Sequence, residues 1–264
     1  MAKANKHLLP ANLGSHSAYY MKGCDHLVIR TKGGPSKAMF KTSPRFANVR
    51  KNNDEFGAAG MAAGKIVRAM YAIKHLSDPH IAGRLTSIAT IIKKLDTVNI
   101  LGQRTIAFSK YPHVLEGFDL NRELAFDTVV KNGIATSISR EDLTATVTLP
   151  DLIPRANFNI PWNYPLYRII LVFGVIPDIR NGRQGYGPAN SQTKYFPVQE
   201  QTEWTASYDV RKSEEIVLQL PRESNFDETS SLILSIGIEA GKYVTNTIIE
   251  PVKDVGCGKI CSQV

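Results

Sequence analysis

The second half of the chain presents a series of strand-like segments with no helical segment between them. Residues 143–149 alternate apolar and polar side chains and are rich in β-branched residues, as expected of a strand with one buried face. Clusters of Pro, Gly, Asn and Asp separate this segment from its successors. The others are residues 166–176, 202–210, 214–220, 232–239 and 243–249. Such a succession predicts an antiparallel, sandwich-like β-domain.

Two stretches of this half lie outside the strand pattern. Residues 181–193 form a long polar segment, which we expect to be a contact loop on the surface. The tail after Pro251 contains Gly256 and Gly258, and we expect it to be an extended arm.

Two helical segments are predicted before the β-domain. Ser43-Pro44 and Ser77-Asp78-Pro79 each combine a capping residue with proline, a typical helix start. In the first segment the apolar positions are Phe46, Val49, Phe56, Ala63, Val67 and Met70. In the second they are Ile81, Leu85, Ile88, Ile92 and Leu95, with Arg84, Lys93 and Lys94 off the apolar stripe. Both stripes have helical spacing.

Three glycines interrupt the first helical segment, at Gly57, Gly60 and Gly64. Each costs up to about 1 kcal/mol relative to alanine in a helix interior. The pattern leaves two interpretations open, a close backbone approach by another element or a break in the helix.

An extended arm is predicted at the start of the chain. Residues 17–21 and 26–31 are strand-like with Lys22-Gly23 near the turn, which indicates a hairpin. Gly33-Gly34-Pro35 is expected to end regular structure. The arm has few large apolar residues, so it must lie on its own subunit or on a neighbour. The overall prediction is an α+β chain with an arm at 1–42, a basic helical region at 43–110 and a β-rich domain with its tail at 111–264.

Charge is distributed unevenly along the sequence. Residues 1–110 contain 18 Lys and Arg against 5 Asp and Glu, whereas residues 111–264 contain 14 against 19. A basic segment attracts phosphate backbones or acidic protein surfaces, and basic and acidic parts on one chain allow head-to-tail attraction between copies. A solvated basic face without a specific partner is the third interpretation.

Aromatic residues are interleaved with cations in the early part of the chain, including Phe40 and Phe46. Cations suit phosphates, and aromatic faces stack on bases. The candidate residues for nucleic-acid or subunit contact are Tyr19, Tyr20, Lys22, Arg30, Lys32, Lys37, Lys41, Arg45, Arg50 and Lys51.

Motifs that carry catalysis are not found in the sequence. There is no H-E-x-x-H and no G-x-S-x-G, and residues 60–65 lack the spacing of a phosphate loop. The three cysteines, Cys24, Cys257 and Cys261, are too few for a disulfide framework and have no zinc-site spacing, so free thiols are expected. We therefore predict no catalytic residues, metal or cofactor, and an enzyme with a site assembled from scattered residues is the least favoured alternative.

A cytoplasmic location is predicted, with release by lysis left open. The first ten residues carry charge but no apolar core of a secretory signal. The longest apolar run, residues 169–176, is far shorter than the ~20 residues that cross a bilayer, so no membrane partner is expected.

The stretch Lys32-Gly33-Gly34-Pro35-Ser36 is followed by Arg50-Lys51-Asn52-Asn53-Asp54-Glu55-Phe56-Gly57. This K-G-G-P-S and R-x-N-x-x-E-F-G signature resembles a family of uncharacterised proteins from Bacteroidota genomes. The resemblance covers about residues 15–105. It implies a bacterial source and a helical part followed by a β-rich part, and it brings no known activity.

These patterns together favour a structural subunit that builds a homomeric filament, tube or shell, as in virus-like or phage-tail-like particles. In this hypothesis the arm at 1–42 adds a strand to a neighbouring copy, and a contact of this kind propagates helically if it does not close. The alternative is a coat or packaging protein whose basic half binds RNA or DNA.

Overall fold

The structure is a computed structural model that describes residues 2–4, 13–20, 26–190, 196–221, 227–245 and 247–264. The chain divides into two compact units, residues 1–50 (unit 1) and residues 51–264 (unit 2). Each unit is described by itself.

Unit 1 contains a small antiparallel sheet. The predicted hairpin is confirmed: β2 (His16–Tyr20) pairs with β3 (Leu27–Thr31), and Tyr19 lies opposite Val28. A third strand, β1 (Ala2–Ala4), pairs with the other edge of β3, which gives the order β1-β3-β2. β3 is therefore the central strand, and it contributes the buried residues of this sheet.

A short helix follows the sheet where no regular structure was expected. α1 (Lys37–Thr42) begins after Ser36, whose side chain accepts a hydrogen bond from the Met39 amide at 3.1 Å. Gly33-Gly34-Pro35 does follow the end of β3, but the prediction of an extended arm up to residue 42 is wrong, because Ser36 caps a new helix. The Ser43-Pro44 signal starts a 3-10 turn, η2 (Pro44–Phe46), which leads into α2 (Ala47–Ala69).

The two predicted helices are present, and the apolar stripe predicted for the first is buried only in its second half, at Ala63 and Met70. The buried positions of α2 are mostly small: Glu55, Ala58, Ala59, Ala62, Ala63, Ile66 and Ala69. Phe56, placed in the apolar stripe from its spacing, is 66% exposed. Alanine lets the helix axis approach the sheet closely, so the small residues form the packed face. The remaining helices are η3 (Tyr71–Leu76), α3 (Ile81–Leu95), η4 (Phe108–Lys110) and α4 (Phe126–Val129).

The three glycines of α2 do not break the helix, so the predicted break is wrong. Among the residues that the structure describes, nothing lies within 4 Å of a Cβ added at Gly57, Gly60 or Gly64. No described element of the chain therefore makes the close approach that was the other interpretation. The helix remains continuous over 23 residues because its alanine-rich face packs against the core.

Two antiparallel sheets form the body of unit 2. The main sheet has the order β10-β6-β12-β13, and β9 also pairs with β6. Its strands are β6 (Leu166–Pro177), β9 (Val198–Gln201), β10 (Thr205–Ala206), β12 (Ser230–Tyr243) and β13 (Ile249–Gln263). The second sheet has the order β11-β5-β4, with β4 (Ala135–Ser139), β5 (Thr144–Leu149) and β11 (Glu214–Gln219). A separate hairpin joins β7 (Ile179–Gly182) and β8 (Gly185–Pro188).

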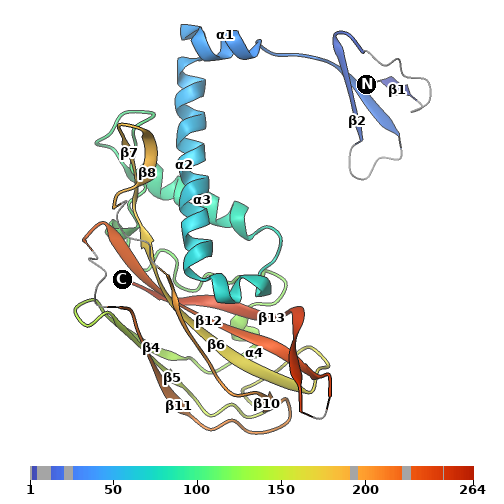
Figure 1. The fold of residues 1–264 in the computed structure, drawn as a ribbon, viewed down its shortest axis with the longest axis vertical. Helices are drawn as coiled ribbons and strands as arrows, with labels where there is room; N and C mark the ends of the chain where they lie inside the picture. The colour runs from blue at the N-terminus through green and yellow to red at the C-terminus, as the bar shows by residue number, and fades with distance from the viewer. Residues whose placement is uncertain (1, 5–12, 21–25, 191–195, 222–226, 246) are drawn as a thin grey trace. The chain divides into compact units, whose positions relative to one another are not determined.

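The main sheet is covered on both faces (Figure 1). On β6, Ile170 and Val172 belong to the core shared with α2, η3 and α3, whereas Leu171 and Phe173 belong to the core shared with the second sheet. Burial on both faces explains why β6 is a continuous apolar run rather than an alternating one. The predicted α+β fold with a sandwich-like β-domain is thereby confirmed.

Glycines in the main sheet make room for the helical layer. A Cβ at Gly174 would lie 2.5 Å from the Ala69 carbonyl oxygen, and one at Gly237 would lie 2.7 Å from the side chains of Ile73 and Leu76. Glycine inside a strand often marks such a close approach. Gly174 thus lets the end of α2, and Gly237 lets η3, pack directly on the sheet backbone.

Several predicted boundaries in the β-domain are wrong. The expected C-terminal arm is β13, which pairs with β12 and lies inside the main sheet. Residues 243–249 mostly connect these two strands, and only Thr205–Ala206 of residues 202–210 are a strand. The polar segment 181–193, expected to be a loop, contains the end of β7 and all of β8, and residues 191–193 lie outside the described residues. Pairing with β12 outweighs the weak strand propensity of Gly256 and Gly258 in β13.

Candidate functional site: the basic N-terminal unit

The excess positive charge of the chain lies entirely in unit 1. Residues 1–50 contain nine Lys and Arg and one acidic residue, Asp25. The other 23 of the chain's 32 Lys and Arg, and the other 23 of its 24 Asp and Glu, lie in unit 2. Unit 2 is therefore formally neutral. Within unit 2, residues 51–110 still contain nine Lys and Arg against four Asp and Glu, and the acidic excess of residues 111–264 balances them.

Unit 1 has very little apolar core. Among its described residues only Leu27 and Val28 are buried, at 6% and 4% exposure, and α1 has no buried residue. Large apolar side chains stay in contact with solvent instead, including Met39 and Val49. Chains below about 40 residues seldom fold without extra support, and a unit of this size is marginal. The sheet of unit 1 thus needs more burial than its own described residues supply.

The predicted tyrosines lie on β2 and are accessible. Tyr19 is half-exposed, and the guanidinium carbon of Arg30 lies 5.4 Å from the centroid of its ring. This is a cation–π arrangement between neighbouring strands. Tyr20 is 57% exposed. The structure therefore brings Tyr19 and Arg30 together and leaves Tyr20 available for contact.

Two of the predicted cations bind the backbone of unit 1. Lys32 Nζ donates to the Gly14 carbonyl oxygen at 2.9 Å. Arg50 Nη1 donates to the carbonyl oxygens of Phe40, at 2.7 Å, and Ser43, at 3.0 Å. A guanidinium at these carbonyls neutralises the negative end of α1. Arg50 therefore joins α1 to the start of α2, a structural role that the sequence pattern did not reveal.

The remaining predicted cations are solvent-facing. Lys37, Lys41 and Arg45 are exposed and form no ion pair with a residue that the structure describes. Lys51 belongs to unit 2, where its stem would clash with any side chain at Gly102. Lys22 lies outside the described residues. Lys37, Lys41 and Arg45 thus form the accessible cationic set of unit 1 between β3 and α2.

Charged residues inside unit 2 are used to hold its layers together. Glu55 is buried, and its carboxylate accepts from the Gly102 amide at 2.8 Å and pairs with Lys93 Nζ at 3.0 Å. Burial acts to raise the pKa of Glu55, but these two bonds outweigh it and the pKa lies below its ordinary value. The placement of Lys93 off the packed face is wrong, because its ammonium reaches this buried carboxylate.

A second buried carboxylate joins η3 to the main sheet. Glu239 on β12 is hydrogen-bonded by His75 Nε2 at 2.8 Å and by the Arg168 guanidinium. Arg168 also stacks over Trp204, with 4.5 Å between its guanidinium carbon and the ring. Desolvation opposes ionisation of Glu239, yet its pKa is lowered because both partners stabilise the anion. Both carboxylate oxygens are therefore occupied by structural partners.

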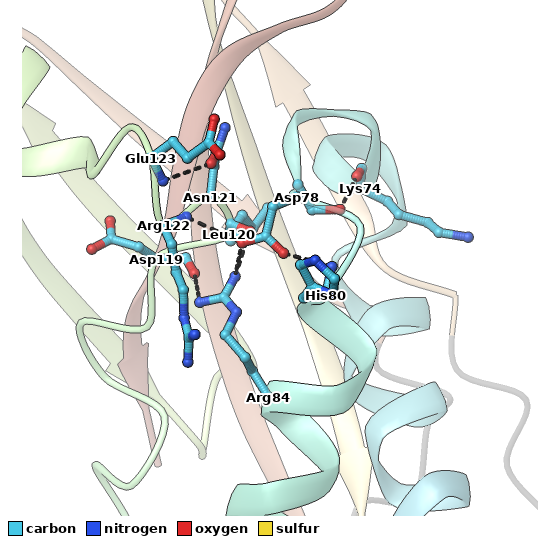
Figure 2. A network of polar contacts seen from close by, with 10 residues as sticks. Lys74, Asp78, His80, Arg84, Asp119, Leu120, Asn121, Arg122 and Glu123 are labelled. Atoms are coloured by element: carbon cyan, nitrogen blue, oxygen red, sulfur yellow. Dashed lines mark hydrogen bonds and ion pairs between the residues drawn. The ribbon is translucent and has the colours of Figure 1, made fainter. Parts of the chain in front are cut away.

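Figure 2 shows a third polar network, at the start of α3. Arg84 donates to Asp78 at 2.9 Å and to the carbonyl oxygens of Asp119, at 2.7 Å, and Leu120, at 2.6 Å. The Leu120 amide in turn donates to the Gly258 carbonyl on β13. The network attaches residues 119–120 both to α3 and to β13, the edge strand of the main sheet. Residues 119–120 thereby cover that edge.

The described cysteines are not activated. Cys257 is buried and Cys261 partly buried, both are free, and burial raises the pKa of both thiols. A raised pKa disfavours the nucleophilic thiolate. Within the described parts of the chain, no group of three or more His, Cys, Asp or Glu is placed to hold a metal ion.

Comparison with known proteins does not extend this description. No family model matches the chain, and no curated protein and no solved structure matches it. Over the described residues, no helix has the length and apolar character needed to cross a membrane.

Proposed function

We propose that this chain is a structural subunit of a homomeric assembly, in which unit 1 packs against a neighbouring copy. One observation carries the proposal: the sheet and helices of unit 1 bury only Leu27 and Val28 among their described residues. Conformational entropy opposes an ordered segment of this size unless apolar surface is buried elsewhere. A second copy of the chain supplies such a surface.

The form of the N-terminal sheet supports this mode of contact. β2 is an edge strand in the order β1-β3-β2. An edge strand presents amide and carbonyl groups that pair with a strand of another molecule. The exposed Tyr20 on this strand adds apolar area to such a contact. Repeated head-to-tail contacts build a filament or tube when they do not close, and a ring or shell when they do.

Nucleic-acid coating or packaging is the second candidate, and the charge of unit 1 favours it. Nine cations against one acid in 50 residues make a strongly positive segment, while unit 2 is neutral. Lys37, Lys41 and Arg45 are exposed, and phosphate backbones attract such cations. Assembly and nucleic-acid binding are compatible, as in a ribonucleoprotein rod.

The test compares two variants with the full chain. Deletion of residues 1–31 removes the N-terminal sheet, and the triple variant Lys37→Gln, Lys41→Gln, Arg45→Gln removes exposed charge but keeps the sheet. Light scattering and negative-stain microscopy measure assembly, and the 260/280 nm absorbance ratio reports bound nucleic acid. The deletion is expected to abolish assembly and the triple variant to retain it.

Each outcome distinguishes the two functions. A full chain that stays monomeric at high concentration contradicts the assembly proposal. Nucleic acid in the purified particles that is lost in the triple variant supports the second candidate. Particles free of nucleic acid, or binding that does not respond to salt, exclude it.

A further inference from the structure

A pocket of about 730 Å³ lies at one end of the β-domain of unit 2. One wall comes from the segment between β5 and β6, and the other comes from Ser207 and Tyr208, just after β10. Its volume is within the range of about 300–1,000 Å³ typical of small-molecule sites. The ends of β-sandwiches, where loops cluster, are frequent positions for binding sites.

The wall between β5 and β6 is a fixed loop. The Asn157 side chain accepts from the Ile153 amide at 2.7 Å and donates to the Asp151 carbonyl oxygen at 2.8 Å. The Asn157 carbonyl oxygen accepts from the Lys131 amide at 2.9 Å. Within this loop Arg155 has a φ of 65°, a left-handed conformation that few non-glycine residues adopt. The loop is thus held in one conformation before any ligand arrives.

Hydrogen bonds also join the two walls. The Ser207 amide donates to the Pro165 carbonyl oxygen at 2.8 Å, and Ser207 Oγ donates to the Tyr164 carbonyl oxygen at 2.7 Å. These bonds hold the backbone of Ser207, the residue before Tyr208, against the opposite wall. A preformed cavity binds a ligand without paying to order its own walls.

Aromatic rings line the pocket. Trp162 and Tyr164 are partly buried in its wall, and Tyr208 is 77% exposed. Together with the buried Phe158, these residues place four aromatic rings along one pocket. Flat rings beside a preformed cavity suit a ligand that is itself flat on one face.

Hydrogen-bonding side chains are placed among these rings. Asn159, Asn163 and Arg155 line the pocket and are exposed. None of these side chains is bonded to a residue that the structure describes, whereas Asn157 in the same loop is fully engaged. An amide side chain offers a donor and an acceptor together, and a guanidinium offers paired donors. The pocket therefore presents both kinds of hydrogen-bonding group and carries one positive charge.

We propose that this pocket binds an oligosaccharide. A pyranose ring has an apolar face for Tyr208 and the neighbouring rings, and its hydroxyl groups both donate and accept, as Asn159 and Asn163 require. Arg155 matches a pair of adjacent hydroxyls or a sugar carboxylate. A polyproline segment also stacks on aromatic rings, but its backbone offers acceptors alone, so it bonds only to the N–H groups of Asn159 and Asn163 and not to their amide oxygens. Ligand binding at this pocket is a separate function from the proposed assembly and does not depend on it.

Saturation-transfer NMR on the full chain tests the proposal. The probes are oligosaccharides of glucose, mannose, galactose, N-acetylglucosamine and glucuronic acid, together with an oligoproline peptide. At least one oligosaccharide is expected to receive saturation, strongest at the protons of one ring face. The variant Tyr208→Ala should weaken its affinity about tenfold, the loss expected for one aromatic contact.

Matched variants make the result decisive. Tyr243→Ala removes another exposed tyrosine, one that does not line the pocket, and should leave binding unchanged. Asn163→Ala tests the pocket a second time if Tyr208→Ala folds poorly. Assembly should be unaffected by all of these, so failure here is distinct from failure of the assembly proposal. The proposal is overturned if no oligosaccharide receives saturation, if the oligoproline alone does, or if the pocket variants bind as the parent does.

Discussion

Unit 1 holds nine cations and one acid and buries two large apolar residues among those described, whereas unit 2 is formally neutral and contains two extensive apolar clusters. Regular secondary structure alone therefore does not show that a segment buries enough apolar surface to fold by itself. Unit 2 is stabilised by its own three layers. Unit 1 has strands and a capped helix, but the free energy that keeps them ordered must come from outside its described residues.

The largest expected loss of stability comes from a buried ion pair in unit 2. Glu239→Gln removes the anion that His75 and Arg168 share, and removing one partner of a buried ion pair costs about 3–5 kcal/mol. Chemical denaturation should show this loss in the free energy of unfolding. The control Glu214→Gln breaks the more exposed pair with Arg211 and should cost at most about 1 kcal/mol. Equal losses for the two variants contradict this account of Glu239.

The second-largest loss of stability is expected from a substitution that overpacks the contact between the helical layer and the main sheet. Gly174→Val places a side chain 2.5 Å from the Ala69 carbonyl oxygen and should cost about 1–3 kcal/mol or more, despite the strand propensity of valine. Gly60→Ala, on the open face of α2, should instead stabilise by up to about 1 kcal/mol. Thermal unfolding compares the two, and a destabilised Gly60→Ala would show that this glycine has a partner.

Acid weakens unit 2 through Asp96, which follows α3. Burial acts to raise the pKa of Asp96, but bonds from Asn99, Thr105 and Val98 lower it from 3.8 to about 2. A depressed folded-state pKa means that stability is present above the ordinary pKa and is lost as pH falls through the folded value. We expect Asp96→Asn to remove about 1–2 kcal/mol of unfolding free energy at neutral pH and little at pH 2. An equal loss at both pH values contradicts this assignment.

The smallest effect on stability is expected in unit 1. Tyr20→Ser should change the unfolding free energy of unit 2 by less than about 0.5 kcal/mol, since Tyr20 is exposed and belongs to the other unit. The same variant should shift assembly to higher protein concentration in light scattering. Assembly equal to that of the parent chain would remove Tyr20 from the proposed contact.

Local patterns predicted part of this structure. The alternation of residues 143–149 gives β5, and Ser77-Asp78-Pro79 marks the start of α3, because these signals act over a few residues. Phe56 was misplaced because spacing alone does not tell whether alanine or phenylalanine faces the core. β13 was missed because pairing with β12, not local propensity, makes it a strand.

Among the candidate site residues, Arg50 likewise has a role that local sequence patterns do not predict. The sequence identifies its charge but not the carbonyl groups of Phe40 and Ser43 that it binds. The sequence did not predict the pocket because its two walls, residues 154–165 and residues 207–208, are far apart in the chain. Charge could be read from the sequence, whereas the partners of each charge depend on the fold.

Amide hydrogen–deuterium exchange of the full chain, measured at low and high protein concentration, tests whether unit 1 depends on a neighbouring copy to stay ordered. The account predicts that amides of β3 (Leu27–Thr31) exchange rapidly in dilute protein and become protected as copies associate. Amides of β12 (Ser230–Tyr243) should be protected equally at both concentrations. Protection of β3 that is already complete in a dilute monomer would contradict the claim that unit 1 depends on a neighbouring copy.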